Sequence, residues 1–358
     1  MMVRVRFAPS PTGSLHIGSA LTAVANRRFA DERDGAMILR IDDTDASRSQ
    51  AAAEAGILRD LEWLGIRFDE GPIRQSERRE CYREAAARLV AAGGAYEDDG
   101  AIRFPQERRP TLLRPDGTAT YHLATVVDDI ELGITHVIRG KDHLSNRPLH
   151  EAIARTLGAD PPEYIHHGLL VGEDGAKLSK RHSAASLADL REQGIPAEAV
   201  RRYLEELGLP RGDVRFDEAR LAGLAVDAIA ALTDEELAAR AGVPVEAAAA
   251  LRGARTLVEV REIASSLLAP PAQHAAAEEA RSTLERFREL RASANGHLDT
   301  DAAKRIIQEV RASGGNLRAL RLALTGAERG PELWTVLLAL PRDEALRRVD
   351  VALGNAVA

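Results

Sequence analysis

A histidine at the start of a predicted helix is the first candidate for chemistry on a nucleotide phosphate. It lies in the run Arg6-Phe-Ala-Pro-Ser-Pro-Thr-Gly-Ser-Leu-His16-Ile-Gly18-Ser19, where an apolar segment passes through a turn-rich stretch into His-Ile-Gly. A helix that begins there offers unpaired N–H groups and a positive dipole end to a phosphate. His16 would donate a hydrogen bond to a phosphate oxygen, and Gly18 would let a nucleotide approach the backbone closely. Taken alone, the triplet also fits an ordinary turn between a strand and a helix.

A second motif, Lys177-Leu-Ser-Lys180-Arg181, follows the glycine-containing stretch Gly172-Glu-Asp-Gly175. Two lysines on a loop would close over a triphosphate and neutralise charge on departing pyrophosphate. A five-residue basic run by itself is more commonly a solvated loop. The two motifs therefore gain weight only as a pair.

Alternating strands and helices must position the first motif. Val3–Ala8 and Met37–Ile41 are short apolar segments, which predict strands. Apolar residues at helical spacing predict helices over His16–Arg33, Ala51–Leu64 and Cys81–Ala92. This order predicts a mostly parallel sheet, because parallel strands need crossover connections between them.

A second set of segments continues this pattern up to the lysine motif. It comprises Tyr121–Val127, then Thr135–Arg139, and then a helix over Arg147–Leu157. Ile165–Val171 resembles a last strand before the loop. The fold class that we expect for this half is α/β.

The second half of the chain is predicted to be all-helical. Strand-like segments disappear after about Ser186, and Ala, Leu, Glu and Arg dominate to the end, without a repeat of fixed period. The predicted helices are Ala197–Leu207, Asp217–Ala225, Thr233–Ala241, Val245–Arg252, Leu257–Leu268, Ala275–Ala292, Asp299–Ser313, Asn316–Leu324, Pro331–Leu338 and Arg342–Gly354.

Composition excludes several classes of protein. The 358 residues include 48 Lys and Arg and 55 Asp and Glu, giving a net charge of −7 that indicates no nucleic-acid partner by itself. Cys81 is the single cysteine, which excludes a disulfide framework and a multi-cysteine zinc site. No apolar run approaches the roughly 20 residues of a membrane span, and no signal-peptide stretch is present. We expect a cytoplasmic protein with no membrane partner and no zinc.

The two motifs, in this order and separation, resemble the ATP-binding signatures of class I aminoacyl-tRNA synthetases. Further strings resemble the glutamyl-tRNA synthetase family within that class, and the resemblance covers roughly Val3–Gly208 with one large gap. These strings are Arg40-Ile-Asp-Asp-Thr-Asp45, Trp63-Leu-Gly, Asp69-Glu-Gly-Pro72, Tyr121-His-Leu-Ala, Val127-Asp-Asp129 and His136-Val-Ile-Arg-Gly140.

The resemblance implies an ATP site in which His16, Lys177 and Lys180 are the catalytic residues. Mg²⁺ would arrive with ATP and keep several waters, so no protein metal site is expected. A metal site at Asp42, Asp43 and Asp45 stays an alternative by composition. The implied ATP-binding residues are Pro9, Ser10, Thr12, His16, Gly18, Ser19, Asp142, Leu169, Leu170, Lys177, Leu178, Ser179 and Lys180.

The resemblance also implies a glutamate site. A bidentate arginine suits a carboxylate and an acidic residue suits the α-ammonium, which falls here on Asp42, where the family more commonly has glutamate. A structural ion pair is the alternative for Arg139, and helix capping is the alternative for Asp43 and Asp45. The implied amino-acid-binding residues are Arg6, Ala8, Ser10, Asp42, Tyr121, Thr125 and Arg139.

The implied architecture is a Rossmann-like catalytic domain over residues 1–185, a helical stem-contact-like region over 186–245 and a reduced anticodon-binding-like domain over 246–358. The family carries an acceptor-stem subdomain between the halves of its sheet. Here that interval is residues 97–113, which is long enough for a strand and a loop only. Lys141 also stands where the family usually has an acidic residue.

Three functions stay open. The first is formation of glutamyl-adenylate and its transfer to the 3′ end of tRNA by a monomer. The second is transfer of activated glutamate, or an analogue, to another acceptor such as a modified tRNA base, a small amine or a carrier. The third is a non-catalytic binding role. Basic residues of the C-terminal helices, such as Arg286, Arg288 and Arg318, either contact nucleic acid or pair with neighbouring glutamates.

Overall fold

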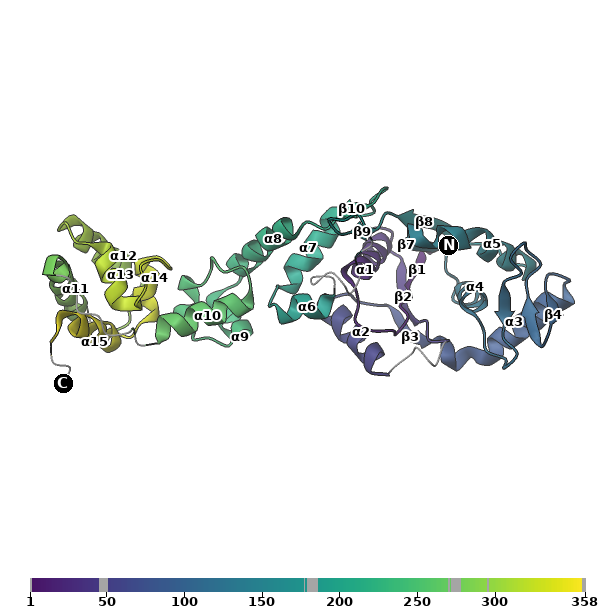
Figure 1. The fold of residues 1–358 in the computed structure, drawn as a ribbon, viewed down its shortest axis with the longest axis horizontal. Coiled ribbons are helices and arrows are strands. Elements are labelled where there is room, and N and C mark those ends of the chain that lie inside the picture. The colour runs from purple at the N-terminus through teal and green to yellow at the C-terminus, as the bar shows by residue number, and fades with distance from the viewer. Residues whose placement is uncertain are drawn as a thin grey trace. The chain divides into compact units, whose positions relative to one another are not determined.

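The computed structural model describes residues 2–44, 51–176, 178, 186–269, 271, 278–294 and 296–355. The chain divides into two compact units. The first comprises Met1–Glu192 and Val200–Glu218, and the second comprises Gln193–Ala199 and Ala219–Ala358. Figure 1 shows strands in the first unit and helices alone in the second. Within the described ranges, no helix has the length and apolarity to cross a membrane.

Parallel strands form the centre of the first unit, as predicted. β1 (Arg4–Phe7), β2 (Ala36–Ile41) and β3 (Glu70–Arg74) pair in that order, and β7 (His136–Gly140) pairs with β8 (Glu163–His167). Thr135 N donates to Arg4 O over 2.9 Å, which sets β7 beside β1. The chain therefore adds strands first on one side of β1 and then on the other. Such a switch point is where parallel sheets hold ligands, outside the carboxyl ends of the strands.

Helices connect and cover these strands. α1 (Ile17–Asp31) and α2 (Ala51–Trp63) lie close to their predicted ranges. α3 (Arg79–Ala91) also follows its prediction, after the short 3₁₀ helix η1 (Gln75–Arg78). α1 presents ten buried residues, so it packs as an internal helix rather than a surface one.

Tyr121–Val127 is helical, as the first turns of α4 (Tyr121–Glu131). Seven consecutive buried residues, from Leu123 to Asp129, explain why its period is not visible in the sequence. η2 (Lys141–Asn146) and α5 (Arg147–Thr156) follow β7.

The interval at residues 97–113 holds more regular structure than one strand and a loop. β4 (Tyr96–Asp98), β5 (Ala101–Arg103) and β6 (Thr111–Leu113) form a three-stranded antiparallel sheet. Phe104 and Leu112 pack from it against Tyr82 of α3 in a shared apolar cluster. The interval is thus a minimal meander that closes over α3 and α4.

The expected last strand is interrupted, and one strand lies beyond Ser186. β8 ends at His167, and the chain continues as the two-residue strand β9 (Leu170–Val171). β9 pairs in parallel with β10 (Val214–Arg215), although no strand was predicted after about Ser186. Two residues are too few to show a period, so the sequence carries no signal for β10. α6 (Leu187–Glu192) and α7 (Ala197–Leu207) lie between β9 and β10.

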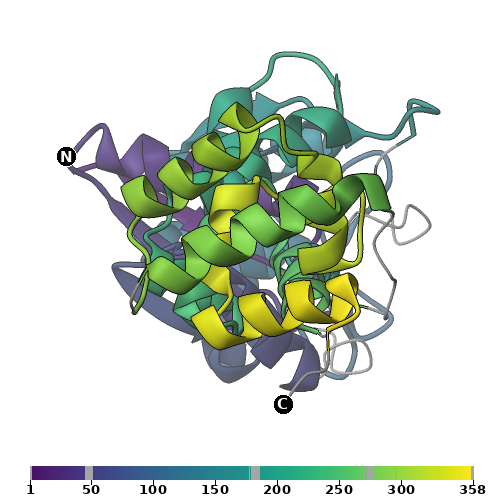
Figure 2. The ribbon, with the colours of Figure 1, turned by 90° about the vertical axis from the view of Figure 1, so that its left-hand side faces the viewer.

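Helices make up the second unit, as predicted, and Figure 2 shows the last of them, in green and yellow, crossing one another. The predicted helix over Val245–Arg252 is the shorter 3₁₀ helix Val245–Ala250 rather than an α-helix, and Thr233 caps α9 in a capping box with Glu236. The elements are α8 (Glu218–Ala231), α9 (Asp234–Ala241), η3 (Val245–Ala250), α10 (Leu257–Leu268), η4 (Glu278–Ala280), α11 (Arg281–Ser293), α12 (Thr300–Ala312), α13 (Leu317–Thr325), α14 (Leu333–Ala339) and α15 (Arg342–Leu353).

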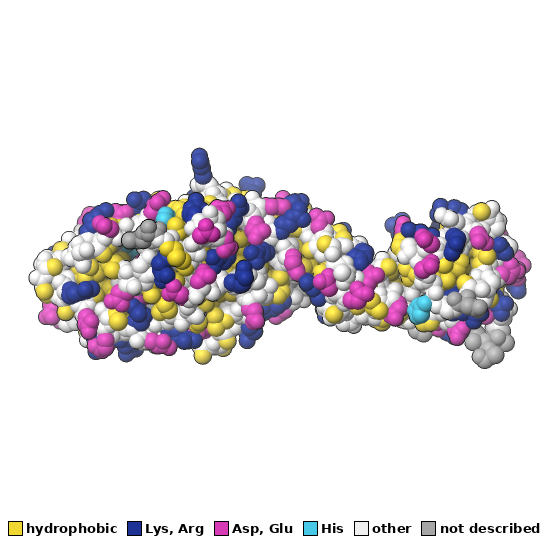
Figure 3. Space-filling view, turned by 180° about the vertical axis from the view of Figure 1, so that it is seen from behind, with side chains coloured by type: hydrophobic (Ala, Val, Ile, Leu, Met, Phe, Trp, Pro, Cys, Tyr) yellow, Lys and Arg dark blue, Asp and Glu magenta, His cyan; other side chains and the backbone are white. Residues whose placement is uncertain are grey.

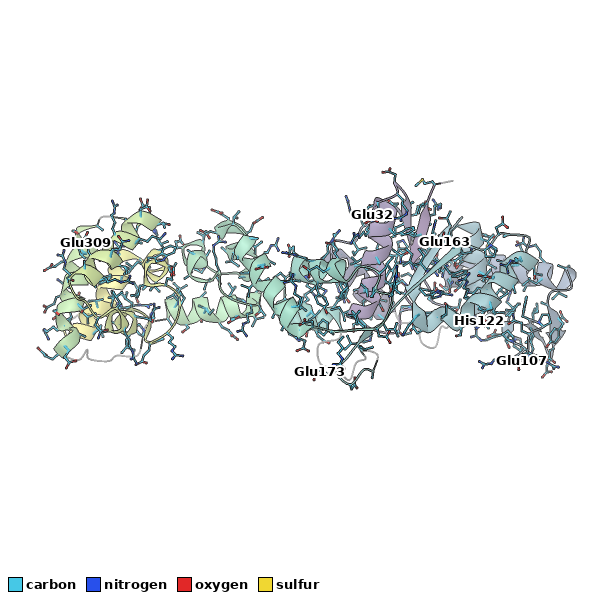
Figure 4. All side chains as sticks on the ribbon, turned by 90° about the horizontal axis from the view of Figure 1, so that it is seen from above. Glu32, Glu107, His122, Glu163, Glu173 and Glu309 are labelled. Carbon is cyan, nitrogen blue, oxygen red and sulfur yellow. The ribbon has the colours of Figure 1, made fainter. Side chains whose placement is uncertain are left out.

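Ion pairs account for part of the basic character of these helices. Arg286 pairs with Glu289 and with Glu309, which Figure 4 labels on α12, and Arg288 pairs with Asp350. Figure 3 shows Lys and Arg in dark blue interspersed with Asp and Glu in magenta. These arginines therefore follow the second alternative, in which basic residues of the C-terminal helices pair with neighbouring acidic residues.

Candidate active site

A cavity of about 340 Å³ opens in the first unit at the carboxyl ends of β1 and β7. Residues from β1, the loop after it, the first turns of α1 and the end of β7 surround it. The predicted site residues that line it are Arg6, Ala8, Pro9, Ser10, Thr12, His16, Gly18, Ser19, Asp42, Tyr121, Arg139, Asp142, Leu169, Leu170 and Leu178. The structure thus brings most of the predicted ATP and amino-acid residues to one cavity.

Four predicted residues are not placed there. Thr125 lies one turn beyond Tyr121 on α4, is 1% exposed and does not line the cavity. Lys177, Ser179 and Lys180 lie outside the described residues. Leu178 is the residue of the second motif that the structure describes, and it lines the cavity.

The cavity also contains residues that the sequence analysis did not assign to a site. Thr22 lines it one turn after Gly18, so the helical spacing of α1 could have indicated it. His143 and His167 line it as well, and His167 is fixed at both ring nitrogens. Its Nδ1 lies 2.8 Å from Gly168 O and therefore donates, so its Nε2 accepts the hydroxyl hydrogen of Thr22 at 3.0 Å. Burial lowers the pKa of His167, consistent with this neutral tautomer.

The first turn of α1 faces the cavity without a side-chain cap. His16 is the residue before the helix and makes no capping hydrogen bond. Its Nδ1 is buried and has no hydrogen-bond partner among the described residues. A proton on this nitrogen would be an orphaned buried donor, so we assign the proton to Nε2. A methyl group added to Gly18 would meet no atom within 4 Å, because this position faces open space.

Arg139 is buried among neutral partners. Its Nη1 donates to Tyr121 Oη and its Nε donates to His166 Nε2, both at 3.3 Å. Its guanidinium also lies over the ring of Tyr164, 5.2 Å from the centroid. Burial lowers the pKa of His166 to about 4, so this imidazole is neutral at pH 7 and accepts. Nη2 is buried and has no hydrogen-bond partner among the described residues, and burial lowers the pKa of Arg139.

The alternative of a structural ion pair for Arg139 is not what the structure shows. No ion pair joins Arg139 to an acidic side chain among the described residues. An unpaired buried guanidinium N–H is costly, at about 1–3 kcal/mol, unless a ligand completes it. The arrangement therefore suits an incoming carboxylate.

Arg6 and Arg40 share one carboxylate beneath the cavity. Asp129 Oδ1 accepts from Arg6 Nε at 3.2 Å and from Arg40 Nη1 at 2.8 Å. Arg40 is fully buried, and its Nε also lies 3.5 Å from Asp128 Oδ2. Three buried aspartates, including Asp42, stabilise this cation, so the pKa of Arg40 is raised well above its usual range despite burial.

Asp128 is the second buried carboxylate of this network. It accepts from Gln75 Nε2, Arg78 Nε and Tyr82 Oη at 2.8 to 3.0 Å. Because these donors come from η1 and α3, the carboxylate fastens the start of α3 to α4. In this network the positive charges of Arg6, Arg40 and Arg78 balance the negative charges of Asp42, Asp128 and Asp129. Among the described residues, Arg139 forms no ion pair with these aspartates.

Asp42 is bound by Arg40, which lies two residues earlier in the chain. Arg40 Nε donates to Asp42 Oδ1 at 2.6 Å and Arg40 Nη2 donates to Oδ2 at 3.2 Å. Burial raises the pKa of Asp42, and Arg40 opposes that shift. Each oxygen keeps a further lone pair, so Asp42 can still accept from a ligand in the cavity that it lines.

Asp43 binds the start of η1. Its carboxylate accepts from Ser76 N at 2.8 Å and from Ser76 Oγ at 2.6 Å. Residues 45–50, which lead into α2, lie outside the described residues, so capping of α2 stays a prediction. Asp45 lies outside the described residues.

Two neutral histidines pack against Tyr121. His122 on α4, labelled in Figure 4, has its Nδ1 3.1 Å from Nε2 of His150. Their rings lie 5.4 and 5.6 Å from the ring of Tyr121. His150 Nδ1 is buried and, within the part of the chain that the structure describes, has no partner, so we assign its proton to Nε2, which donates to His122. The rings of His122 and His150 therefore both pack against the ring of Tyr121.

Acid is expected to destabilise the protein through His150. Burial lowers its pKa from 6.5 to about 2, so the unfolded chain binds a proton that the folded chain excludes. This stabilisation is complete above the unfolded pKa and falls by about 1.4 kcal/mol per pH unit below 6.5. Urea unfolding of the wild type and of His150→Gln, between about pH 6.5 and 4.5, checks this. The variant should lose stability less steeply, and equal slopes would contradict the assignment.

A model of a known protein family matches the part of the chain that contains the cavity. The family model described as the catalytic domain of class I tRNA synthetases (E and Q) matches residues 2–107 and 99–218. The two matched segments meet at the three-stranded sheet of β4, β5 and β6. The match to the family model is thus divided within residues 97–113, the short interval between the halves of the sheet.

Two relatives match almost end to end. A protein named glutamate–tRNA ligase 1 from Rubrobacter xylanophilus is 36% identical over 98% of this chain and 97% of its own length. A glutamate–tRNA ligase from Akkermansia muciniphila is 34% identical over 97% of this chain and 98% of its own. These alignments run over 426 and 425 positions, against 358 residues here, so both relatives carry residues that this chain lacks.

A solved structure shares the fold. The glutamate tRNA ligase from Elizabethkingia meningosepticum, in complex with its amino acid, superposes with a TM-score of 0.81, covering 99% of each chain at 23% identity. At this identity the likeness concerns the fold alone. The family model and the near full-length relatives show that the chain belongs to the class I tRNA synthetases of the glutamate and glutamine subgroup.

Proposed function

We propose that the protein activates glutamate with ATP and transfers it to the 3′ end of tRNA. The observation that carries this proposal is Arg139, a buried arginine at the cavity whose described partners are all neutral. A glutamate side-chain carboxylate there would accept a hydrogen bond from Nη2, which has no partner among the described residues, and would compensate the charge. We place this enzyme in the cytoplasm, because ATP, its proposed substrate, is available there.

The α-amino and α-carboxylate groups would lie closer to β1 and β2. Arg6 is tied to Asp129 through Nε alone, which leaves the rest of its guanidinium for the α-carboxylate. Asp42 has acceptor capacity for the α-ammonium beyond its two bonds to Arg40. Ser10 and Ala8 line the same part of the cavity. Thr125 is not assigned a direct contact, because it does not line the cavity.

ATP would occupy the part of the cavity formed by α1 and by Leu169, Leu170 and Leu178. The uncapped start of α1 presents backbone N–H groups and the positive end of the helix dipole to the phosphates. The Nε2–H of His16 would donate to the α-phosphate as the carboxylate of glutamate attacks it. Lys177 and Lys180 would neutralise the pyrophosphate that leaves.

Mg²⁺ belongs to the ATP substrate in this proposal. Oxygen ligands suit the ion, and Asp142 is the acidic residue that lines the cavity beside the predicted phosphate position. In the described part of the chain, no three His, Cys, Asp or Glu side chains gather to hold a metal ion. The ion would accordingly be held mainly by phosphate oxygens and water.

The transfer step distinguishes tRNA 3′-end charging from delivery to another acceptor. Radiolabelled glutamate, ATP and total tRNA should give acid-precipitable label that mild alkali releases, because the product is an ester. Periodate treatment destroys the terminal ribose diol and should abolish labelling. Label that survives periodate would favour a base acceptor and overturn 3′-end transfer. ATP–pyrophosphate exchange with glutamate is measured with and without total tRNA, and a failure of exchange under both conditions would overturn activation itself.

Gly18→Ala should weaken ATP binding without destabilising the protein. The added methyl group meets no protein atom within 4 Å and would occupy space that the nucleotide needs. Alanine also favours a helix over glycine by about 1 kcal/mol. We expect KM for ATP in pyrophosphate exchange to rise about tenfold or more, with an unchanged or higher Tm.

Gly223→Ala is the matched control for this variant. Gly223 lies inside α8, and a methyl group there also meets nothing within 4 Å. It should give the same helix stabilisation with no change in KM. A Gly18→Ala enzyme with an unchanged KM for ATP would show that the nucleotide does not approach this turn.

A further inference from the structure

Asp60 is a buried carboxylate on an apolar face of α2. Ile57, Leu61 and Leu64 lie at helical spacing around it, and Asp60 itself is 1% exposed. An apolar side chain would pack on this face without burying a charge, and buried ion pairs stabilise a fold less than apolar packing does. The presence of a carboxylate on this apolar face is therefore explained by the groups that it binds.

Its two oxygens hold two segments that are distant in the sequence. Oδ2 accepts from the backbone N–H of Leu15 at 3.3 Å, immediately before His16. Oδ1 accepts from Arg191 Nη1 on α6 at 2.9 Å. One carboxylate thus fixes the residue before the candidate catalytic histidine and the helix that comes after the lysine motif in the sequence.

These two segments are also paired with each other. Leu187 N donates to Leu15 O over 2.9 Å, and His16 forms an antiparallel bridge with Ser186. Leu15 therefore uses both of its backbone groups, the N–H on Asp60 and the C=O on Leu187. Through Arg191, Asp60 also fixes the far end of the helix that begins at Leu187.

We propose that Asp60 is a positioning residue for His16. It sets the backbone of Leu15 and His16 at the entry of α1, so that Nδ1 of His16 stays buried and Nε2 is presented to the cavity. Asp60 does not line the cavity, so it acts through His16 and not on substrate. This inference rests on the proposed role of His16 in adenylate formation.

The test compares Asp60→Asn, Arg191→Gln and the double variant in ATP–pyrophosphate exchange with glutamate. Asparagine keeps the shape of Asp60 and an oxygen for Leu15 N, but it weakens both contacts. We expect kcat to fall about 10- to 100-fold, because small displacements of a catalytic group have effects of this size. KM for glutamate should stay within about twofold, and the double variant should be no slower than Asp60→Asn.

A second comparison separates positioning from general stability. In a His16→Ala background, Asp60→Asn should cause no further loss of kcat, because there is no imidazole left to position. Glu70→Gln, which breaks the surface ion pair with Arg4 in the same unit, is the matched control and should leave kcat unchanged.

The outcomes distinguish this inference from the proposed function. A His16→Ala enzyme with wild-type exchange would overturn the role of His16, and the positioning role with it. A slow His16→Ala enzyme beside a normal Asp60→Asn enzyme would overturn the positioning role alone. A loss of kcat from Asp60→Asn that persists in full in the His16→Ala background would assign Asp60 to the fold and would likewise overturn the inference. If Asp60→Asn does not fold, Arg191→Gln, whose side chain is 35% exposed, gives the same three outcomes.

Discussion

Arg139→Gln should lower kcat/KM for glutamate by about 10²–10³-fold, the effect of removing one partner of a buried, hydrogen-bonded charge pair. KM for ATP should change little, since Arg139 is held by Tyr121 and His166 rather than by the first turn of α1. Pyrophosphate exchange with glutamate and ATP varied separately measures both constants.

Stability should respond in the opposite sense to most buried-arginine substitutions. Arg139 has no acidic partner in the described part of the chain, and burial lowers its pKa, so its charge is a cost to the unliganded fold. Arg139→Gln should therefore leave Tm unchanged or raise it. A strong loss of stability would indicate an ion-pair role that the structure does not show.

Arg147→Gln is the matched control for Arg139. Arg147 also lies over the ring of Tyr164, at 5.6 Å, but it is about half exposed and pairs with Glu151 on its own helix. Its loss should affect kcat/KM for glutamate less than about twofold, as is typical of exposed pairs. Equal losses in the two variants would contradict a specific carboxylate site at Arg139.

Arg40→Met should destabilise the first unit by about 3–5 kcal/mol, the largest stability effect that we expect in this chain. Methionine fills a similar volume, but it leaves Asp42, Asp128 and Asp129 buried without the cation that they share. The free energy of unfolding in urea measures the effect. Since the chain has two units, the probe must report on the first.

Tryptophan fluorescence provides that probe. The chain has two tryptophans, Trp63 on α2 in the first unit and Trp334 in the second. In a Trp334→Phe background, the fluorescence of Trp63 reports unfolding of the first unit alone. Arg4→Met is the control, because Arg4 pairs at the surface with Glu70, and its loss should destabilise by no more than about 1 kcal/mol. Equal effects of the two substitutions would show that the buried network is not cooperative.

The sequence determined the local elements wherever a period or a terminal signal was present. α7 and α10 have the predicted ranges, Ala197–Leu207 and Leu257–Leu268, because their apolar residues recur at helical spacing. α4 and β10 were not recognised. α4 is buried on too many sides to show an amphipathic period, and β10 exists only because β9 lies beside it.

The sequence likewise determined the family and most of the residues of the cavity. The motifs around His16 and Tyr121 are contiguous strings, and each string has one place in a strand–loop–helix unit. Their assembly in one cavity follows from the carboxyl ends of β1 and β7 meeting at the switch point of the sheet.

Only the tertiary structure decided which charges are balanced and which are not. Arg6, Arg40 and Arg139 are alike in the sequence, yet the first two share Asp129, whereas the hydrogen-bond partners of Arg139 in the described part of the chain are neutral. In the sequence, Asp60 is an ordinary acidic residue on a predicted helix. Only the structure shows that its oxygens bind Leu15 and Arg191. Ion pairing and burial depend on which distant segments come together, and a linear pattern carries no record of those distances.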